Sequence, residues 1–130
     1  MEQKVNYIGI VRSSLRSLKD CPLQERENAP EATIEIYPEF KKGLSDIKKD
    51  AELVILSWLH QADRTVLQTK PRNEKSAQLT GVFSTRSPDR PNPIGMHVAK
   101  VLAVDGCNIR VSQLEVLDGT PVLDLKPVIN

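Results

Sequence analysis

The sequence predicts an all-β domain, a small barrel or sandwich of about eight short, mainly antiparallel strands. Short apolar runs and alternating apolar–polar stretches recur along its 130 residues, as expected of half-buried strands. Asp105-Gly106 and Asp118-Gly119 are typical tight-turn pairs. The crossover helices that a doubly wound α/β fold needs are not predicted anywhere in the chain.

The first two strands flank a long polar stretch. Residues 5–11 read Val-Asn-Tyr-Ile-Gly-Ile-Val and are rich in strand formers. Residues 33–37 alternate between polar and apolar types, which predicts a half-buried strand. Residues 13–30 between them are polar and contain two prolines. A loop of this length in a small domain is usually functional or mobile.

The middle of the chain predicts one short helix and two strands. Residues 40–50 favour a helix with Ser45 as its cap, because apolar residues recur there at spacings of three and four: Leu44, Ile47 and Ala51. Residues 53–58 form a continuous apolar run typical of a buried strand. A shorter strand is expected over 65–69, ended by Pro71.

Four further strands are expected in the second half. Residues 81–85 enter a proline-rich stretch, and residues 95–104 alternate weakly. After the Asp-Gly turn, residues 108–117 alternate apolar and polar types, and residues 120–125 close the chain as a last strand.

Composition limits the classes of function. Lys and Arg number 18 against 17 Asp and Glu, so net charge does not indicate a strongly basic nucleic-acid binder, although a local basic face is possible. Cys21 and Cys107 fit no metal-ligand spacing, and the longest apolar run is far too short to span a membrane. We expect one cytoplasmic domain over residues 1–130, with free thiols and no metal.

The stretch from Gly81 to Gly95 is the most unusual part of the sequence. Its segment 85–93, here called the proline loop, holds three prolines together with Arg86 and Arg90. Prolines fix φ and restrict the preceding residue, so the loop is predicted to be rigid. A rigid loop with two guanidinium groups suits an anionic or planar polar ligand better than an ordinary turn.

Two other clusters could carry chemistry. Residues 58–64 end a buried strand with a histidine, an amide, a carboxylate and an arginine, and His60 could serve as an acid, a base or a hydrogen-bonding group. Glu115, Asp118 and Asp124 lie within ten residues of one another, and Asp118 could bind sugar hydroxyls or an ammonium group. Taken alone, both clusters fit a structural role slightly better, as a strand end and a tight turn.

Together these motifs resemble the YaeB/TrmO-like family, also called TsaA-like. The matching segments cover nearly the whole chain: residues 8–13, 30–35, 58–64, 71–72, 81–95 and 117–127. The resemblance implies S-adenosylmethionine-dependent methyltransferases built on a β-barrel and working as homodimers. Characterised members methylate N6 of threonylcarbamoyl-adenosine at position 37 of tRNA, so tRNA is the implied partner.

The resemblance also implies the site residues. Cofactor contacts are expected at nine positions: Gln24, His60, Gln61, Arg86, Val98, Glu115, Val116, Leu117 and Asp118. Arg86 suits the cofactor's carboxylate tail, and Asp118 suits its ribose or ammonium group. Asp118 or Asp124 could help remove a proton from the accepting amine. Substrate contacts are expected from Arg90, Asn92 and Thr120.

The chain departs from the family pattern in four respects. Leu23 stands where arginine is frequent, Glu115 where aspartate is usual, and His97 where serine is common in the tRNA enzymes. We also expect no additional C-terminal domain of the kind that longer members carry. Three alternatives follow: a tRNA methyltransferase, a methyltransferase of the same fold with another acceptor, or a non-catalytic S-adenosylmethionine-binding module.

Overall fold

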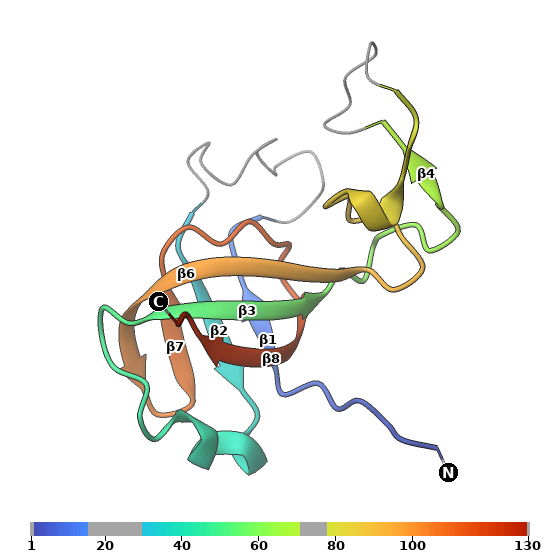
Figure 1. Ribbon diagram of the computed structural model, residues 1–130. Helices are drawn as coiled ribbons and strands as arrows, with labels where there is room; N and C mark the ends of the chain where they lie inside the picture. Colours follow the sequence, from blue (N-terminus) through green and yellow to red (C-terminus); the bar gives the residue numbers. More distant parts are fainter. Residues whose placement is uncertain (1, 16–29, 71–77, 130) are drawn as a thin grey trace.

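Six antiparallel strands close on themselves into a barrel. In the computed structural model, which describes residues 2–15, 30–70 and 78–129, the strand order is β1-β2-β7-β6-β3-β8, and β8 pairs back with β1 (Figure 1). The barrel strands are β1 (Gly9–Arg12), β2 (Ala32–Ile36), β3 (Glu52–Trp58), β6 (Ile94–Asp105), β7 (Asn108–Val111) and β8 (Pro121–Pro127). The prediction of an all-β fold is confirmed.

Alternating side chains fill the barrel. In β2, Ala32, Ile34 and Ile36 are buried, whereas Thr33 and Glu35 between them are only partly covered. Gly9 of β1 has no room for a side chain, because a Cβ atom there would lie 2.3 Å from the Glu35 backbone oxygen. Glycine therefore lets β1 and β2 approach closely inside an otherwise β-branched strand.

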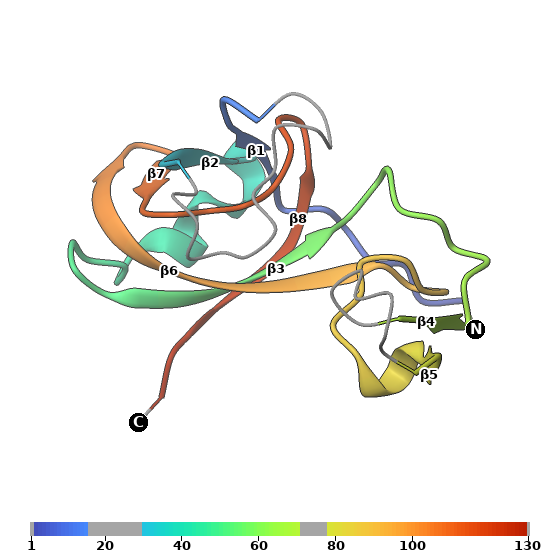
Figure 2. The same cartoon turned by 90° about the horizontal axis from the view of Figure 1, so that it is seen from above.

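The two ends of the barrel are covered by different elements (Figures 1 and 2). At one end lies a 3-10 helix, η2 (Pro38–Leu44), whose Leu44 joins the hydrophobic core. At the other end runs the connection 112–120, which contributes Leu114 and Val116 to the core. Both ends are thus closed by apolar side chains from outside the strands.

A short helix is present where residues 40–50 were predicted to hold one, but its boundaries differ. The helix is of 3-10 type and begins at Pro38, whose fixed φ suits a first helical position. Ser45 lies at the end of this helix, where its backbone N–H and its hydroxyl both donate to the Lys42 carbonyl at 3.3 and 2.6 Å. The serine therefore satisfies a C-terminal carbonyl instead of capping an N-terminus.

Residues 108–117 were expected to be one strand, but β7 ends at Val111. Gln113 has a positive φ of 30°, and the Leu114 N–H donates to the Pro30 carbonyl, so the chain leaves the sheet. Beyond Gln113 the apolar residues are buried again, but Leu114 follows Val111 at a spacing of three, so the period of two is broken before Leu114 and Val116 enter the end of the barrel. The apolar residues of this segment are therefore buried as predicted, but the residues after Val111 do not continue the strand.

The strand expected over residues 5–11 is also shorter, since only Gly9–Arg12 pairs. By contrast, the strand expected over 95–104 is longer, and its 12 residues bend to pair with β3 and then with β7. The turn after it is confirmed: Gly106 has a φ of +61° and Asp105 pairs with Asn108. The turn at Gly119 is confirmed as well, with a φ of +86°.

Residues 59–70 and 78–93 form an outlying lobe beyond the end of β3 and the start of β6 (Figure 1). It holds β4 (Gln68–Thr69), β5 (Thr80–Gly81) and a 3-10 turn, η4 (Val82–Ser84). The strands predicted over 65–69 and 81–85 are therefore reduced to two paired residues each. Within the described ranges, no helix has the length and apolarity to cross a membrane.

Candidate functional site

The proline loop is held in shape by Arg90 as well as by its prolines. The Arg90 Nη1 atom donates to the carbonyls of Thr85 and Ser87 at 3.1 and 3.2 Å, and Nη2 donates to those of Thr85 and Val82. Sequence reasoning proposed Arg90 as a substrate contact or as part of the framework. Its terminal nitrogens are engaged by the loop's own backbone, which is the geometry of a framework residue.

The loop is fastened to the turn that follows β3. The Leu59 N–H donates to the Pro93 carbonyl at 2.8 Å, and the Asp63 N–H donates to the Asp89 carboxylate at 2.8 Å. Arg64 adds a third connection, because its Nε donates to the Pro91 carbonyl at 2.8 Å. The same guanidinium lies 5.1 Å from the centre of the Trp58 ring, which fixes it to the end of β3.

Several predicted cofactor residues are presented by this fastened unit. His60 and Gln61 are exposed at the corners of a turn closed by the Ala62 N–H on the Leu59 carbonyl at 3.0 Å. Arg86 is exposed on the proline loop. Asn92, a predicted substrate contact, accepts a long hydrogen bond of 3.4 Å from Arg64 Nη2. The lobe therefore brings His60 and Gln61 into one rigid unit with the loop of Arg86 and Asn92.

Asp63 in the same unit is held ionised by its neighbour. The Thr65 hydroxyl and the Thr65 backbone N–H both donate to its carboxylate, at 2.6 and 2.8 Å. These bonds lower the pKa of Asp63, with the hydroxyl as the larger cause. Its carboxylate thus stabilises the turn from Asp63 to Thr65, which follows the turn that carries His60 and Gln61.

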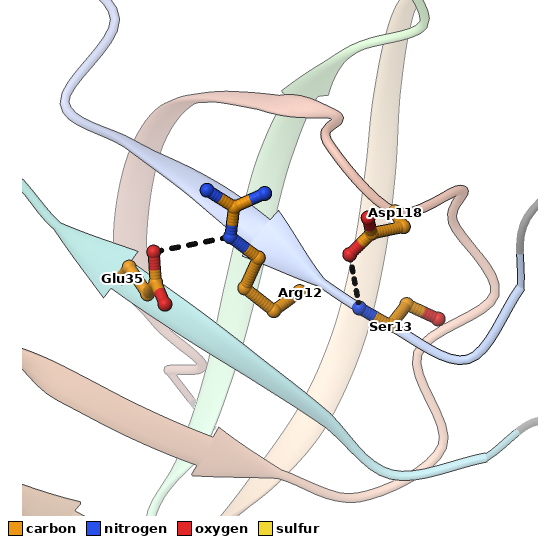
Figure 3. Close-up of polar contacts among 4 residues, drawn as sticks. All are labelled: Arg12, Ser13, Glu35 and Asp118. Carbon is orange, nitrogen blue, oxygen red and sulfur yellow. Dashed lines mark hydrogen bonds and ion pairs between the residues drawn. The ribbon is translucent and has the colours of Figure 1, made fainter.

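The second cluster is the turn from Leu117 to Thr120. The Thr120 N–H and hydroxyl both donate to the Leu117 carbonyl, at 3.1 and 2.7 Å. Asp118 fastens this turn to the end of β1, because its Oδ1 accepts the Ser13 N–H at 2.9 Å (Figure 3). The Asp118 N–H also donates to the Leu15 carbonyl at 2.7 Å.

Burial limits what this second cluster can offer a ligand. Val116, Leu117 and Thr120 are 2%, 7% and 1% exposed, so these side chains pack inward. Their backbone groups are the parts that could face a cofactor. Thr120 was predicted to contact substrate, but its hydroxyl is used within the turn. Glu115 lies half-buried in the same connection.

The remaining predicted residues lie elsewhere. Val98 is 46% exposed on the outer face of β6. Asp124 is exposed on β8, directly across from Leu56, with its carboxylate 3.8 Å from the Lys126 ammonium. Asp118 and Asp124 are therefore in different surroundings and do not form a carboxylate pair. Gln24 lies outside the described residues.

A cavity of about 640 Å³ opens beside Asp118 on the outer face of β1 and β2. Its lining also includes Arg12, Ser13, Ser14, Glu31, Ala32, Thr33 and Arg110. Sequence reasoning missed this cavity. The outward positions of Arg12 and Arg110 could have been inferred from alternation, but their register across three strands could not.

The structure thus places most of the predicted site residues in two separate groups. His60, Gln61, Arg86, Arg90 and Asn92 belong to the lobe, whereas Glu115 to Asp118 and Thr120 belong to one end of the barrel. Across the described ranges, no group of three or more His, Cys, Asp or Glu side chains is arranged to hold a metal ion.

Comparison with known proteins identifies the family of this chain. The family model described as the tRNA-methyltransferase O N-terminal domain matches residues 10–130. A probable S-adenosyl-L-methionine-binding protein of Archaeoglobus fulgidus is 42% identical over 95% of the chain and 33% of its own length. A protein of the same description in Methanothermobacter thermautotrophicus is 39% identical over 98% of the chain and 90% of its own length.

Solved structures agree with the family match. A crystal structure of TrmO from Pseudomonas aeruginosa superposes with a TM-score of 0.74 at 30% identity, covering 99% of this chain and 57% of that one. The chain thus spans a third of the Archaeoglobus protein's length and little more than half of the TrmO chain. With a family match over residues 10–130 and these relatives, the chain belongs to the family of the tRNA-methyltransferase O N-terminal domain.

Proposed function

We propose that this protein is an S-adenosylmethionine-dependent methyltransferase that methylates N6 of threonylcarbamoyl-adenosine at position 37 of tRNA. Membership of the tRNA-methyltransferase O N-terminal domain family over residues 10–130 supports this most strongly. Relatives named for S-adenosyl-L-methionine binding support the cofactor. A tRNA substrate is consistent with the cytoplasmic location that we propose.

The side chains present fit the cofactor in chemical kind. An amino-acid carboxylate is best held by a guanidinium group, and Arg86 offers one on a loop held rigid by Arg90 and three prolines. Ribose hydroxyls suit a carboxylate such as Asp118, and an adenine edge suits backbone groups such as those at Val116 and Leu117. Val98 offers an apolar surface on β6.

The bound cofactor would supply an electrophilic methyl group on a sulfonium. The protein's task in such a transfer is mainly positioning, which the lobe performs by holding its loops through short hydrogen bonds. An exocyclic amine must also lose a proton. Asp118 is better placed than Asp124 to assist, because it lines a cavity, whereas Asp124 is exposed near Lys126.

We also propose that the protein acts as a homodimer. Ile94, Met96 and Val98 are each 46% exposed on the outer face of β6. They lie directly across from Trp58, Leu56 and Val54 of β3, so six apolar side chains form one continuous outer surface. A second copy seated there would cover this surface and would bring another chain next to Val98.

A second candidate is a binding module that holds S-adenosylmethionine without catalysis, since the archaeal relatives are named only for binding. Calorimetry with S-adenosylmethionine tests the premise that both candidates share, and absence of heat at millimolar ligand would refute both. Labelled-methyl transfer to total tRNA then separates them. Incorporation into tRNA supports the methyltransferase, and cofactor binding without incorporation supports the binding module.

A further inference from the structure

A row of three side chains crosses the outer face of three neighbouring strands. Arg12 of β1 pairs directly with Thr33 of β2, and Thr33 pairs directly with Arg110 of β7. Directly opposite residues of antiparallel strands point to the same side, with Cβ atoms about 4.5–5.5 Å apart. Two guanidinium groups therefore flank one hydroxyl at the wall of the 640 Å³ cavity.

Both arginines are oriented by glutamates through their Nε atoms. Arg12 Nε lies 3.2 Å from Glu35 Oε1, and Arg110 Nε lies 3.5 Å from Glu31 Oε1. Figure 3 shows that the contact with Glu35 is made by Nε of Arg12 and not by its Nη atoms. Within the described part of the chain, neither arginine makes another hydrogen bond or ion pair. The Nη1–Nη2 edges, which bind a carboxylate through two parallel hydrogen bonds, are therefore available.

Stability alone does not account for this arrangement. The side chains of both ion pairs are between 42% and 62% exposed, and exposed pairs contribute only about 0–1 kcal/mol. Two cations on either side of one position also repel each other. An anion between them removes that repulsion. Because Glu31 and Asp118 also line the cavity, a ligand with both a carboxylate and hydrogen-bond donors fits its lining better than a simple anion.

We propose that this cavity binds the carboxylate-bearing side group of the acceptor base, with Arg12 and Arg110 holding the carboxylate. The inference rests on the proposed function, in which the acceptor carries a threonylcarbamoyl group with one carboxylate and one hydroxyl. Thr33 is placed to exchange a hydrogen bond with that hydroxyl. Asp118 lines the same cavity, so the side group would lie beside the carboxylate proposed to assist the transfer.

The cofactor is a weaker candidate for the same cavity. Of the nine positions implied for cofactor binding, Asp118 is the one among the described residues that lines it. His60, Gln61 and Arg86 belong to the lobe instead. The two arginines of the row therefore determine specificity for the acceptor.

The test compares two anticodon stem-loop RNAs. One carries threonylcarbamoyl-adenosine, and the other carries the same base with its carboxylate converted to a carboxamide. We expect the wild-type protein to prefer the carboxylate RNA in kcat/KM by about tenfold to hundredfold. Arg12→Gln and Arg110→Gln should each remove most of this preference, by slowing the carboxylate RNA alone. Calorimetric affinity for S-adenosylmethionine should stay unchanged.

Three controls make the test decisive. Arg12→Lys and Arg110→Lys keep the charge without the planar fork, so each should retain part of the preference. Lys41→Gln removes a cation from η2 at the far end of the barrel and should leave the preference intact. Thermal denaturation should show all variants folded, because only exposed pairs are lost.

The possible outcomes separate this inference from the proposed function. If the wild-type protein methylates both RNAs equally well, the inference is overturned and the proposed function stands. Arginine variants that keep the wild-type preference for the carboxylate RNA also overturn the inference. Variants that lose S-adenosylmethionine affinity together with activity on both RNAs overturn it as well, because that result would assign the cavity to the cofactor. A wild-type protein that methylates neither RNA overturns the proposed function and this inference together.

Discussion

Replacing Arg90 with alanine should loosen the proline loop and lower the stability of the protein. Its terminal nitrogens donate to three carbonyls, those of Val82, Thr85 and Ser87, with donor–acceptor distances of 3.1–3.2 Å for the last two. A hydrogen bond from a charged group contributes up to about 1.5–3 kcal/mol, but long bonds at a half-buried site contribute less. Taking about 1 kcal/mol per carbonyl, and allowing water to replace part of it, we expect a loss of about 2 kcal/mol.

Thermal unfolding followed by circular dichroism measures this loss. For a domain of this size, about 2 kcal/mol corresponds to a decrease in Tm of roughly 6–10 °C. Arg90→Lys should fall between the alanine variant and the wild type, because one ammonium group can reach only part of the carbonyl set. An Arg90→Ala Tm within a degree of the wild type would contradict the framework role.

Arg86→Ala is the matched control, since it removes an exposed arginine from the same loop. Its Tm should stay near the wild-type value, because exposed substitutions usually change stability by less than about 0.5 kcal/mol. Its affinity for S-adenosylmethionine should fall by about tenfold to hundredfold if the guanidinium holds the cofactor's carboxylate. Unchanged affinity would remove Arg86 from the proposed site.

The other predictions concern packing, assembly and titration. Gly9→Ala places a Cβ atom 2.3 Å from a backbone oxygen of β2 and should cost at least about 1–3 kcal/mol in a urea titration, whereas Gly43→Ala meets nothing within 4 Å and should be nearly neutral. Met96→Glu puts a charge on the apolar surface of β3 and β6; light scattering should show the proposed dimer for the wild type and a monomer for this variant, and an unchanged mass would exclude this surface. Thr65→Val removes the main cause of the lowered pKa of Asp63, so that pKa should rise in an NMR titration. Because a lowered carboxyl pKa stabilises the folded state above the unfolded value, the wild-type advantage over this variant should be lost as pH falls through the lowered pKa.

Local patterns predicted the barrel well where burial and pairing coincide. The alternation of residues 33–37 and the Asp-Gly pairs identified β2 and two turns, because period and turn chemistry are local properties. The same rule failed after Val111, where Leu114 and Val116 are buried at the barrel end without pairing in a strand. The spacing of three from Val111 to Leu114 breaks the period of two, and this break marks the place where the chain leaves the sheet.

The candidate site, too, was predicted only where it depends on local sequence. Sequence patterns identified the proline loop, but its attachment through Arg64 to Pro91 and to Trp58 depends on segments far apart in the chain. The row formed by Arg12, Thr33 and Arg110 depends on the register of three strands, which a single sequence does not specify. The attachment of the proline loop and the cavity are therefore evident only from the three-dimensional structure.

The central claim is that this barrel methylates a modified adenosine in tRNA. Purified protein should be incubated with S-adenosylmethionine and tRNA from cells that make threonylcarbamoyl-adenosine, and in parallel with tRNA that lacks this modification. Mass spectrometry of the digested tRNA should then show one added methyl group on threonylcarbamoyl-adenosine in the first sample and no new methylated nucleoside in the second. Absence of methylation in both, or equal methylation of an unmodified base, would contradict the claim.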